Sequence, residues 1–142
     1  MTRLIFTILF LYIASNYTYA QDLVLDSIEQ LRWNSRVILV KIDNDDQVTL
    51  STLRKSSNEI NERDINWFVF SDDSFYSNYE DRIGRNFQAS IVEEYFETNK
   101  NIVLLGKDGY VKLRSESLEL EEIFNLIDSM PMRQLEMSSQ SE

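Results

Sequence analysis

The sequence predicts an α/β domain, with a mixed sheet, helices on both faces and the element order β-α-β-α-β-β-α. Residues 37–42 (VILVKI) and 65–70 (INWFVF) are apolar almost throughout, which is typical of parallel strands buried on both faces. Helical spacing over residues 47–61 between them completes a right-handed βαβ unit. Residues 102–114 (IVLLGKDGYVKLR) place Asp-Gly between two strand-like runs, which predicts an antiparallel hairpin.

The segment before the first strand has no clear period and fits a short helix or an extended lead-in. Trp33 at its end is expected to cover one end of the core, with stacking on a ligand as the alternative. After the first strand, Asp45 or Asp46 is placed to cap the helix over 47–61. A carboxylate at that position accepts hydrogen bonds from free backbone amides and meets the positive end of the helix dipole.

The second half of the chain predicts two more helices around the hairpin. Residues 71–81 are polar and aromatic and are expected to form a loop. Residues 82–98 then carry apolar side chains every four positions, at Ile83, Phe87, Ile91 and Tyr95. After the hairpin, Ser117 is expected to cap a last helix that runs to Ser129 and ends before Pro131.

The first twenty residues have the features of a secretory signal peptide. Arg3 supplies the positive end, residues 4–14 form a short apolar run, and Thr18-Tyr19-Ala20 provides small residues at the cleavage positions. Cleavage would leave one domain at 21–131 and a polar tail at 132–142, which is expected to be disordered. We therefore expect export to the periplasm or the extracellular space, without a stable membrane anchor after cleavage.

Charge and composition exclude several classes of function. The formal net charge is −10, so nucleic acid and anionic lipid are not expected as partners. The sequence has no cysteine and no histidine, and therefore no thiol nucleophile, no imidazole base and no His or Cys ligand for zinc, copper or iron. No cofactor is expected.

At this point the element order suggests a thioredoxin-like sheet. In such a fold a reactive cysteine lies after the first strand, at the start of the following helix. Here the position is occupied by Asp43, Asn44, Asp45 and Asp46, with Thr49 just inside the helix. These residues can cap the helix in a solvated loop, or bind calcium, although the spacing is not that of an EF-hand.

A second candidate site is cationic. Lys107, Lys112 and Arg114 lie on the hairpin, and Arg133 follows the last predicted helix. Alternation predicts Lys112 and Arg114 on one face of their strand. These charges can protect an open sheet edge from pairing, and Arg133 can cap helix carbonyls. Alternatively the four cations form a face that binds an anionic or carboxylate-bearing partner, with Arg133 brought beside the edge strand by the final helix.

Several segments resemble one family of domains of unknown function. The resemblance is carried by GKDGYVKLR at 106–114 and DSMPMR at 128–133, together with WNSR at 33–36, Asp45-Asp46, and Glu62-Arg63-Asp64. The family occurs in exported bacterial proteins and in vertebrate sushi-repeat-containing extracellular proteins. The resemblance implies a fold related to thioredoxins and peroxiredoxins, and it implies no reaction.

These observations lead to a working hypothesis of function. We expect an exported, non-redox thioredoxin-like module that binds a protein or a glycan. The alternatives are an enzyme related to thioredoxins or peroxiredoxins that uses a group other than cysteine, and a calcium-dependent binding module.

The signal-peptide assignment predicts a defined mature chain. We expect cleavage between Ala20 and Gln21, because small residues precede that bond at the positions that signal peptidase reads. The intact mass of the protein from the exported fraction measures this. A mass corresponding to a chain that still begins at Met1 would refute the assignment.

Overall fold

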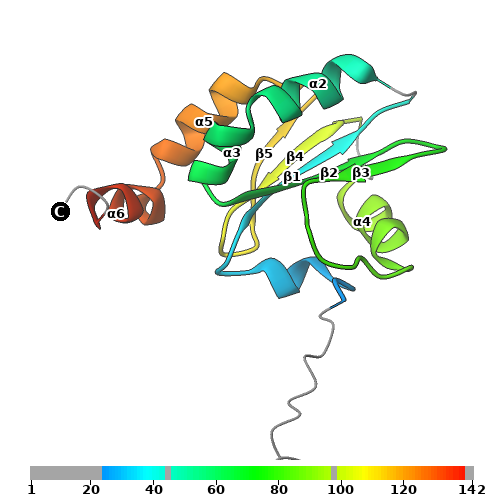
Figure 1. The fold of residues 1–142 in the computed structure, drawn as a ribbon, viewed down its shortest axis with the longest axis horizontal. Helices are drawn as coiled ribbons and strands as arrows, with labels where there is room; N and C mark the ends of the chain where they lie inside the picture. Colours follow the sequence, from blue (N-terminus) through cyan, green and yellow to red (C-terminus); the bar gives the residue numbers. More distant parts are fainter. Residues whose placement is uncertain (1–23, 44–45, 97–98, 140–142) are drawn as a thin grey trace, which may run out of the picture.

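The architecture is a mixed sheet between layers of helices. The computed structural model describes residues 24–43, 46–96 and 99–139. Within these ranges the sheet has five strands in the order β3-β2-β1-β4-β5. Figure 1 shows α2, α3 and α5 on one face of the sheet and α4 on the other. The prediction of an α/β domain with a mixed sheet is confirmed.

The strands at the centre of the sheet match the sequence prediction. β1 (Arg36–Lys41) pairs parallel with β2 (Ile65–Phe70) on one side. On its other side β1 pairs antiparallel with β4 (Ile102–Leu105), which turns into the antiparallel β5 (Val111–Ser115). Gly109 closes this turn at φ +81°, a backbone conformation that residues with a side chain rarely adopt. Both the parallel unit and the hairpin are therefore confirmed.

The single helix expected at 47–61 is divided in two. α2 (Gln47–Lys55) and α3 (Ser57–Glu62) meet at Ser56, whose ψ of 23° leaves the helical range. Asp46 caps α2 by accepting hydrogen bonds from the amides of Val48 and Thr49 at 3.0 and 3.2 Å. The capping prediction is confirmed for Asp46, whereas Asn44 and Asp45 lie outside the described residues.

The expected loop at 71–81 contains a short edge strand, β3 (Phe75–Ser77), which pairs antiparallel with β2. The ring of Phe75 lies 5.3 Å from that of Phe70 and 6.2 Å from that of Phe68, so aromatic packing holds this strand in place. The side chain of Asn78 continues the pairing by accepting a hydrogen bond from the amide of Trp67 and donating one to the carbonyl of Ile65. Three residues are too few for a period to be visible in the sequence.

The helix expected at 82–98 is shorter than its apolar spacing suggests. α4 (Phe87–Tyr95) begins five residues later, because the segment before it pairs with the start of the domain. The amide of Leu25 donates to the carbonyl of Arg82, and the amide of Gly84 donates to the carbonyl of Leu25. The lead-in then forms a short 3₁₀ helix, η1 (Ile28–Leu31).

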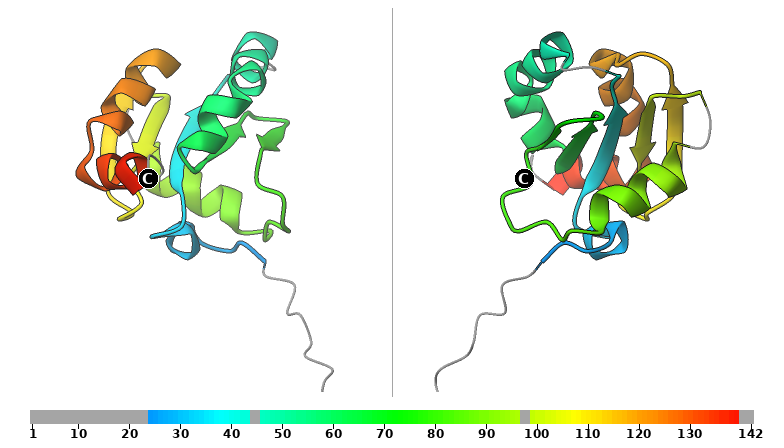
Figure 2. Two further views of the ribbon diagram at one scale, coloured as in Figure 1. Left: turned by 60° about the vertical axis from the view of Figure 1, so that its left-hand side comes forward. Right: turned by 90° about the vertical axis from the view of Figure 1, so that its right-hand side faces the viewer.

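The C-terminal segment contains a helix where a disordered tail was expected. α5 (Leu120–Asp128) is followed by α6 (Pro131–Ser139), so Pro131 begins a helix, as its fixed φ and missing amide hydrogen allow at a first helical position. Ser117 does not cap α5, which begins after Glu119. Figures 1 and 2 show α6 beyond the end of α5 and next to the end of α3. The expectation of disorder does not hold for residues 132–139, because Arg133 is buried and anchors this helix, whereas 140–142 lie outside the described residues.

The core consists of two apolar layers separated by the sheet. Alternate residues of β1 face opposite layers: Ile38 packs on the side of α2, α3 and α5, and Leu39 packs on the side of η1 and α4. Trp33 belongs to neither layer. Its side chain is 62% exposed, so the expectation that it covers one end of the core was wrong.

Among the residues that the structure describes, no helix combines the length and the apolar character needed to cross a bilayer.

Candidate functional site

The four cations of the predicted binding face all have partners within the chain. Lys107 forms ion pairs of 2.8 Å with both Asp64 and Glu136, and its side chain is only 11% exposed. Lys112 pairs with Asp108 at 2.7 Å, within the same turn. None of these groups is simply a solvated charge that protects a sheet edge.

Arg114 lies apart from the other cations. Its guanidinium group donates a hydrogen bond of 2.5 Å to the carbonyl of Tyr95, the last residue of α4. Lys112 instead lines a cavity with Met130 on the side of α5. A register shift between Leu104 and Leu105 in the facing strand disturbs the alternation from which the sequence analysis placed Lys112 and Arg114 together. The two side chains thus have different partners, and Arg114 is not among the residues that line the cavity with Lys112.

Arg133 is among the most buried side chains, with 1% of its surface exposed. It donates to the carbonyl of Glu62, the last residue of α3, and forms ion pairs with the carboxylates of Glu62 and Asp128 at 3.0 and 3.2 Å. The sequence analysis allowed Arg133 to cap helix carbonyls, and the structure shows this for α3. A cation at this end of a helix is favourable because the dipole is negative there.

Arg36 is a residue of this site that the sequence analysis missed. It begins β1, is 1% exposed, and donates a hydrogen bond of 2.8 Å to the carbonyl of Arg63. Its guanidinium group also contacts both carboxylate oxygens of Glu136, at 3.2 and 3.3 Å. Its Nε is buried and has no hydrogen-bond partner in the described structure. A charged residue directly before an apolar strand was the only signal, and it did not reveal a partner one hundred positions away.

We call these groups the arginine network: Arg36, Arg63, Arg133, Lys107, Asp64, Asp128, Glu62 and Glu136. Glu136 is its shared acceptor, because it contacts Arg36, Lys107 and Arg133, the last at 3.8 Å. Arg63 adds a two-pronged contact to Asp128, with donor distances of 3.0 and 2.6 Å. The network thus joins the start of β1, the end of α3, the hairpin turn and α6.

The carboxylates of the network have altered pKa values. Burial alone would raise the pKa of Asp128, but hydrogen bonds and charge from Arg63 and Arg133 lower it below its ordinary value. Burial likewise opposes the ionised form of Glu136, and contacts with Lys107 and Arg36 lower its pKa. Both groups are therefore held in the ionised state by the surrounding cations.

A cavity of about 270 Å³ opens between the hairpin turn and the start of α6. Its cationic residues are Arg36, Lys107 and Lys112, and Asp108 is its one acidic residue among those described. Its remaining lining residues are Gly106, Met130, Pro131 and Met132. The structure therefore brings Lys107 and Lys112 to one cavity, with the thioether side chains of two methionines facing the same space. We call this space the hairpin cavity.

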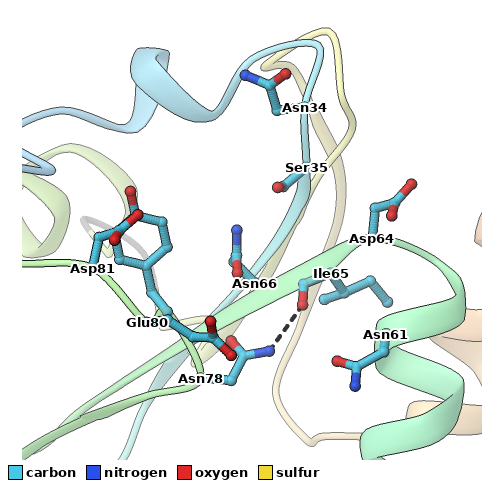
Figure 3. A pocket seen from close by; sticks show the side chains of 10 residues that line it. Asn34, Ser35, Asn61, Asp64, Ile65, Asn66, Asn78, Glu80 and Asp81 are labelled. Carbon is cyan, nitrogen blue, oxygen red and sulfur yellow. Dashed lines mark hydrogen bonds between the residues drawn. The ribbon is translucent and has the colours of Figure 1, made fainter. Parts of the chain in front are cut away.

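A second hollow, of about 370 Å³, lies at the start of β2 and is polar (Figure 3). It is lined by amide and carboxylate side chains that include Asn66, Asn78, Glu80 and Asp81. The amide of Asn78 is directed at the carbonyl of Ile65, as the dashed line in Figure 3 shows, and is therefore occupied by the edge of the sheet. The acidic groups of this hollow would favour a cationic or hydroxyl-rich ligand over an anion.

The acidic segment that the sequence analysis compared with the cysteine position of a thioredoxin-like fold lies at the opposite end of β1 from Arg36. Asp43, Asp46 and Thr49 line a cavity of about 410 Å³ there, whereas Asn44 and Asp45 are not among the described residues. The hydroxyl of Thr49 donates to Asp46 at 2.5 Å, and this bond and two backbone amides lower the pKa of Asp46. Asp46 and Thr49 therefore form the N-terminal cap of α2.

Metal-binding side chains do not gather in the described parts of the chain. Within residues 24–43, 46–96 and 99–139, no three Asp, Glu, His or Cys side chains are grouped in a way that could hold a metal ion.

Comparison with known proteins identifies one family. A family model described as a domain of unknown function, DUF4174, matches residues 27–136. No curated protein matches the chain, and neither does any solved structure. The match extends from η1 to Glu136 and so includes the whole arginine network.

The arginine network predicts that Arg133 is important for stability. We expect Arg133→Gln to lower the free energy of unfolding by about 2–3 kcal/mol, less than for a fully buried ion pair because Asp128 and Glu62 keep contact with water. Arg54→Gln, on the exposed side of α2, is the matched control and should change it by less than about 0.5 kcal/mol. Urea unfolding followed by circular dichroism measures both. Equal effects of the two variants would contradict the anchoring role.

The same network predicts a loss of stability in acid. The ordinary pKa values of Asp128 and Glu136 are 3.8 and 4.5, and both are lowered in the folded protein. Their contribution is therefore present above the ordinary values and is lost as the pH falls through the lowered ones. Urea unfolding should give a higher free energy of unfolding for the native protein than for Glu136→Gln at neutral pH, and this difference should become smaller in acid. A difference that stays constant would contradict this prediction.

Proposed function

The chain belongs to the DUF4174 family of domains of unknown function, and because membership supplies no reaction, we propose its function from the hairpin cavity. The protein is an exported, non-redox, thioredoxin-like module that binds a protein or glycan partner through an anionic group. The observation that carries this proposal is the hairpin cavity itself, in which cationic and apolar side chains meet in an otherwise acidic protein.

The sheet supports the thioredoxin-like interpretation. The parallel pair β1 and β2 is followed by the antiparallel pair β4 and β5, with helices on both faces. β3 is an addition at the β2 edge of this arrangement. The position that a redox member of this fold needs for cysteine is held by a helix-capping aspartate, and the sequence contains no cysteine at all. Thiol-disulfide chemistry is therefore excluded for this chain.

The lining of the hairpin cavity favours a ligand with a carboxylate and a short apolar part. Lys112, whose ion pair with Asp108 is partly exposed to water, supplies positive charge, and the buried Nε of Arg36 supplies a hydrogen-bond donor that no residue of the described chain satisfies. Met130 and Met132 provide an adaptable apolar wall. The volume of about 270 Å³ is slightly below that of typical small-molecule sites, about 300–1,000 Å³, and suits one side chain or terminal group of a partner.

Export is supported by the N-terminal sequence. The apolar run and the cleavage motif that ends at Ala20 are those of a secretory signal. A cysteine-free domain does not depend on the redox state of its compartment, so it can fold outside the cytoplasm without disulfide formation.

The proposal predicts that hexanoate binds in the hairpin cavity and that hexylamine does not. The sequence has four methionines, so ¹³C-methyl labelling gives a nearly empty spectrum in which Met130 and Met132 report on the cavity and Met137 does not line it. Titration with hexanoate should shift the signals of Met130 and Met132, because the acid places its alkyl chain against them. Lys112→Gln should weaken the effect about tenfold or more, as expected for loss of one charge-assisted contact.

The controls for this titration separate binding from catalysis and from general ionic effects. Lys55→Gln removes an exposed lysine from the last turn of α2 and should leave the titration unchanged. A parallel screen for peroxide consumption, insulin reduction and ester hydrolysis should show no turnover. Equal shifts with hexanoate and hexylamine, shifts confined to Met137, or sustained turnover would each contradict the proposal.

A further inference from the structure

An exposed arginine lies between two aromatic rings beside the hairpin turn. The guanidinium carbon of Arg32 is 5.8 Å from the ring centre of Trp33 and 6.0 Å from that of Tyr110. The ammonium group of Lys112 lies 5.9 Å from the ring centre of Tyr110. Trp33 and Tyr110 are 62% and 67% exposed. We call Arg32, Trp33, Tyr110 and Lys112 the aromatic-cation patch.

The backbone is shaped to hold this patch. Gly109 brings the turn so close that a Cβ atom there would lie 2.9 Å from both Cδ and Nε of Arg32. The stem of Arg32 therefore rests on the glycine backbone. Trp33 adopts φ +66°, and its amide donates a hydrogen bond of 2.6 Å to the carbonyl of Lys107. The hairpin turn thus fixes both residues.

The conformation of Trp33 is costly and brings no burial in return. A bulky side chain in the left-handed region is a true outlier, and such strain is concentrated at functional sites. Most large aromatic side chains gain stability by leaving water, but that of Trp33 stays in water. The left-handed backbone conformation of Trp33 thus accompanies an exposed ring.

The guanidinium group of Arg32 is held in place but keeps its donors available. In the described parts of the chain it makes no hydrogen bond and no ion pair, in contrast to Arg36, Arg63 and Arg133. Contacts with two rings restrict its motion, so less side-chain entropy is lost when a ligand binds. The planar fork matches a carboxylate through two parallel hydrogen bonds.

We propose that the aromatic-cation patch binds an acidic segment of a partner polypeptide, in which an Asp or Glu carboxylate pairs with Arg32 and neighbouring apolar side chains cover Trp33 and Tyr110. This inference rests on the proposed function, because the patch and the hairpin cavity lie on the same turn and share Lys112. It specifies the class of partner, and it places the principal contact at Arg32, outside the cavity.

Composition and charge favour a polypeptide over other occupants. Tryptophan, tyrosine and arginine are the residues enriched at the energetic centres of protein interfaces. A polypeptide supplies both carboxylates and apolar side chains, as the two rings and the two cations require. A second copy of this chain is the rival occupant, and the sedimentation measurement below distinguishes it.

The test uses an acetylated Glu-Glu-Leu-Glu-Glu-Leu peptide as the probe, and the same peptide with Lys in place of Glu as its control. The protein has two tryptophans, and Trp67 is only 5% exposed, so quenching by acrylamide reports mainly on Trp33. The acidic peptide should protect Trp33 from the quencher, and calorimetry should give its affinity. The basic peptide should not protect Trp33 and should show no binding in calorimetry.

Variants identify the residue responsible. Arg32→Gln should weaken binding of the acidic peptide at least about tenfold, as expected for a residue at the centre of an interface. Arg32→Lys keeps the charge but loses the planar guanidinium group, so its affinity for the acidic peptide should lie between those of the native protein and Arg32→Gln. Tyr110→Ala should also weaken binding. Arg54→Gln makes the same charge change on α2 and should bind like the native protein.

The outcomes separate this inference from the proposed function. The inference is overturned if the acidic peptide does not protect Trp33, or if Arg32→Gln binds it as tightly as Arg54→Gln does. Protection by sulfated oligosaccharide but not by peptide, or self-association in sedimentation that Arg32→Gln abolishes, would also overturn it. In each case a hexanoate titration that still shifts Met130 and Met132 would leave the hairpin cavity standing.

Discussion

The carboxylate of Glu136 is the point at which distant parts of this chain are joined. It contacts cations from the start of β1, from the hairpin turn and from its own helix. Arg36 and Arg133 are both 1% exposed, and a buried guanidinium group without a partner would be strongly destabilising. The position of α6, the closure of the hairpin turn and the burial of Arg36 therefore depend on one another.

This constraint determines what the hairpin end of the molecule can present. Lys107 is used by Asp64 and Glu136, and Arg133 is used by α3, so neither is a freely available charge. The fixed turn can instead hold other groups in defined positions at the surface. The turn displays Arg32 against two aromatic rings, and it holds Lys112, paired with Asp108, in the lining of the hairpin cavity.

The sequence was most informative where local pattern decides structure. The apolar runs of β1, β2 and β4 and the Asp-Gly turn were visible because their residues share one environment along the strand. The short strand β3 was missed because three residues carry no period, and its stability comes from contacts between rings. The helix α6 was missed because its buried residue is an arginine, which a polar pattern hides.

The candidate sites were harder to predict because their residues interact with distant parts of the chain. Lys107 and Lys112 were identified from the hairpin, and the structure places both at one cavity. Trp33 was expected in the core, but its side chain is exposed. Its backbone conformation is accompanied by a hydrogen bond to Lys107, which lies far along the chain and could not be recognised from the neighbouring sequence. Arg36 and Arg133 owe their roles to carboxylates on other elements, and no spacing within the sequence reveals those pairings.

The pairing of Arg36 with Glu136 also orders events during folding. The two residues are one hundred positions apart, so the first strand and the last helix must meet before the charge on β1 is balanced. Contacts of such long range form late, because closing a long loop of chain is entropically costly. Until α6 docks, the positive charge at the entrance to the central strand lacks the carboxylate of Glu136. Full burial of the Arg36 charge is thereby coupled to the docking of α6.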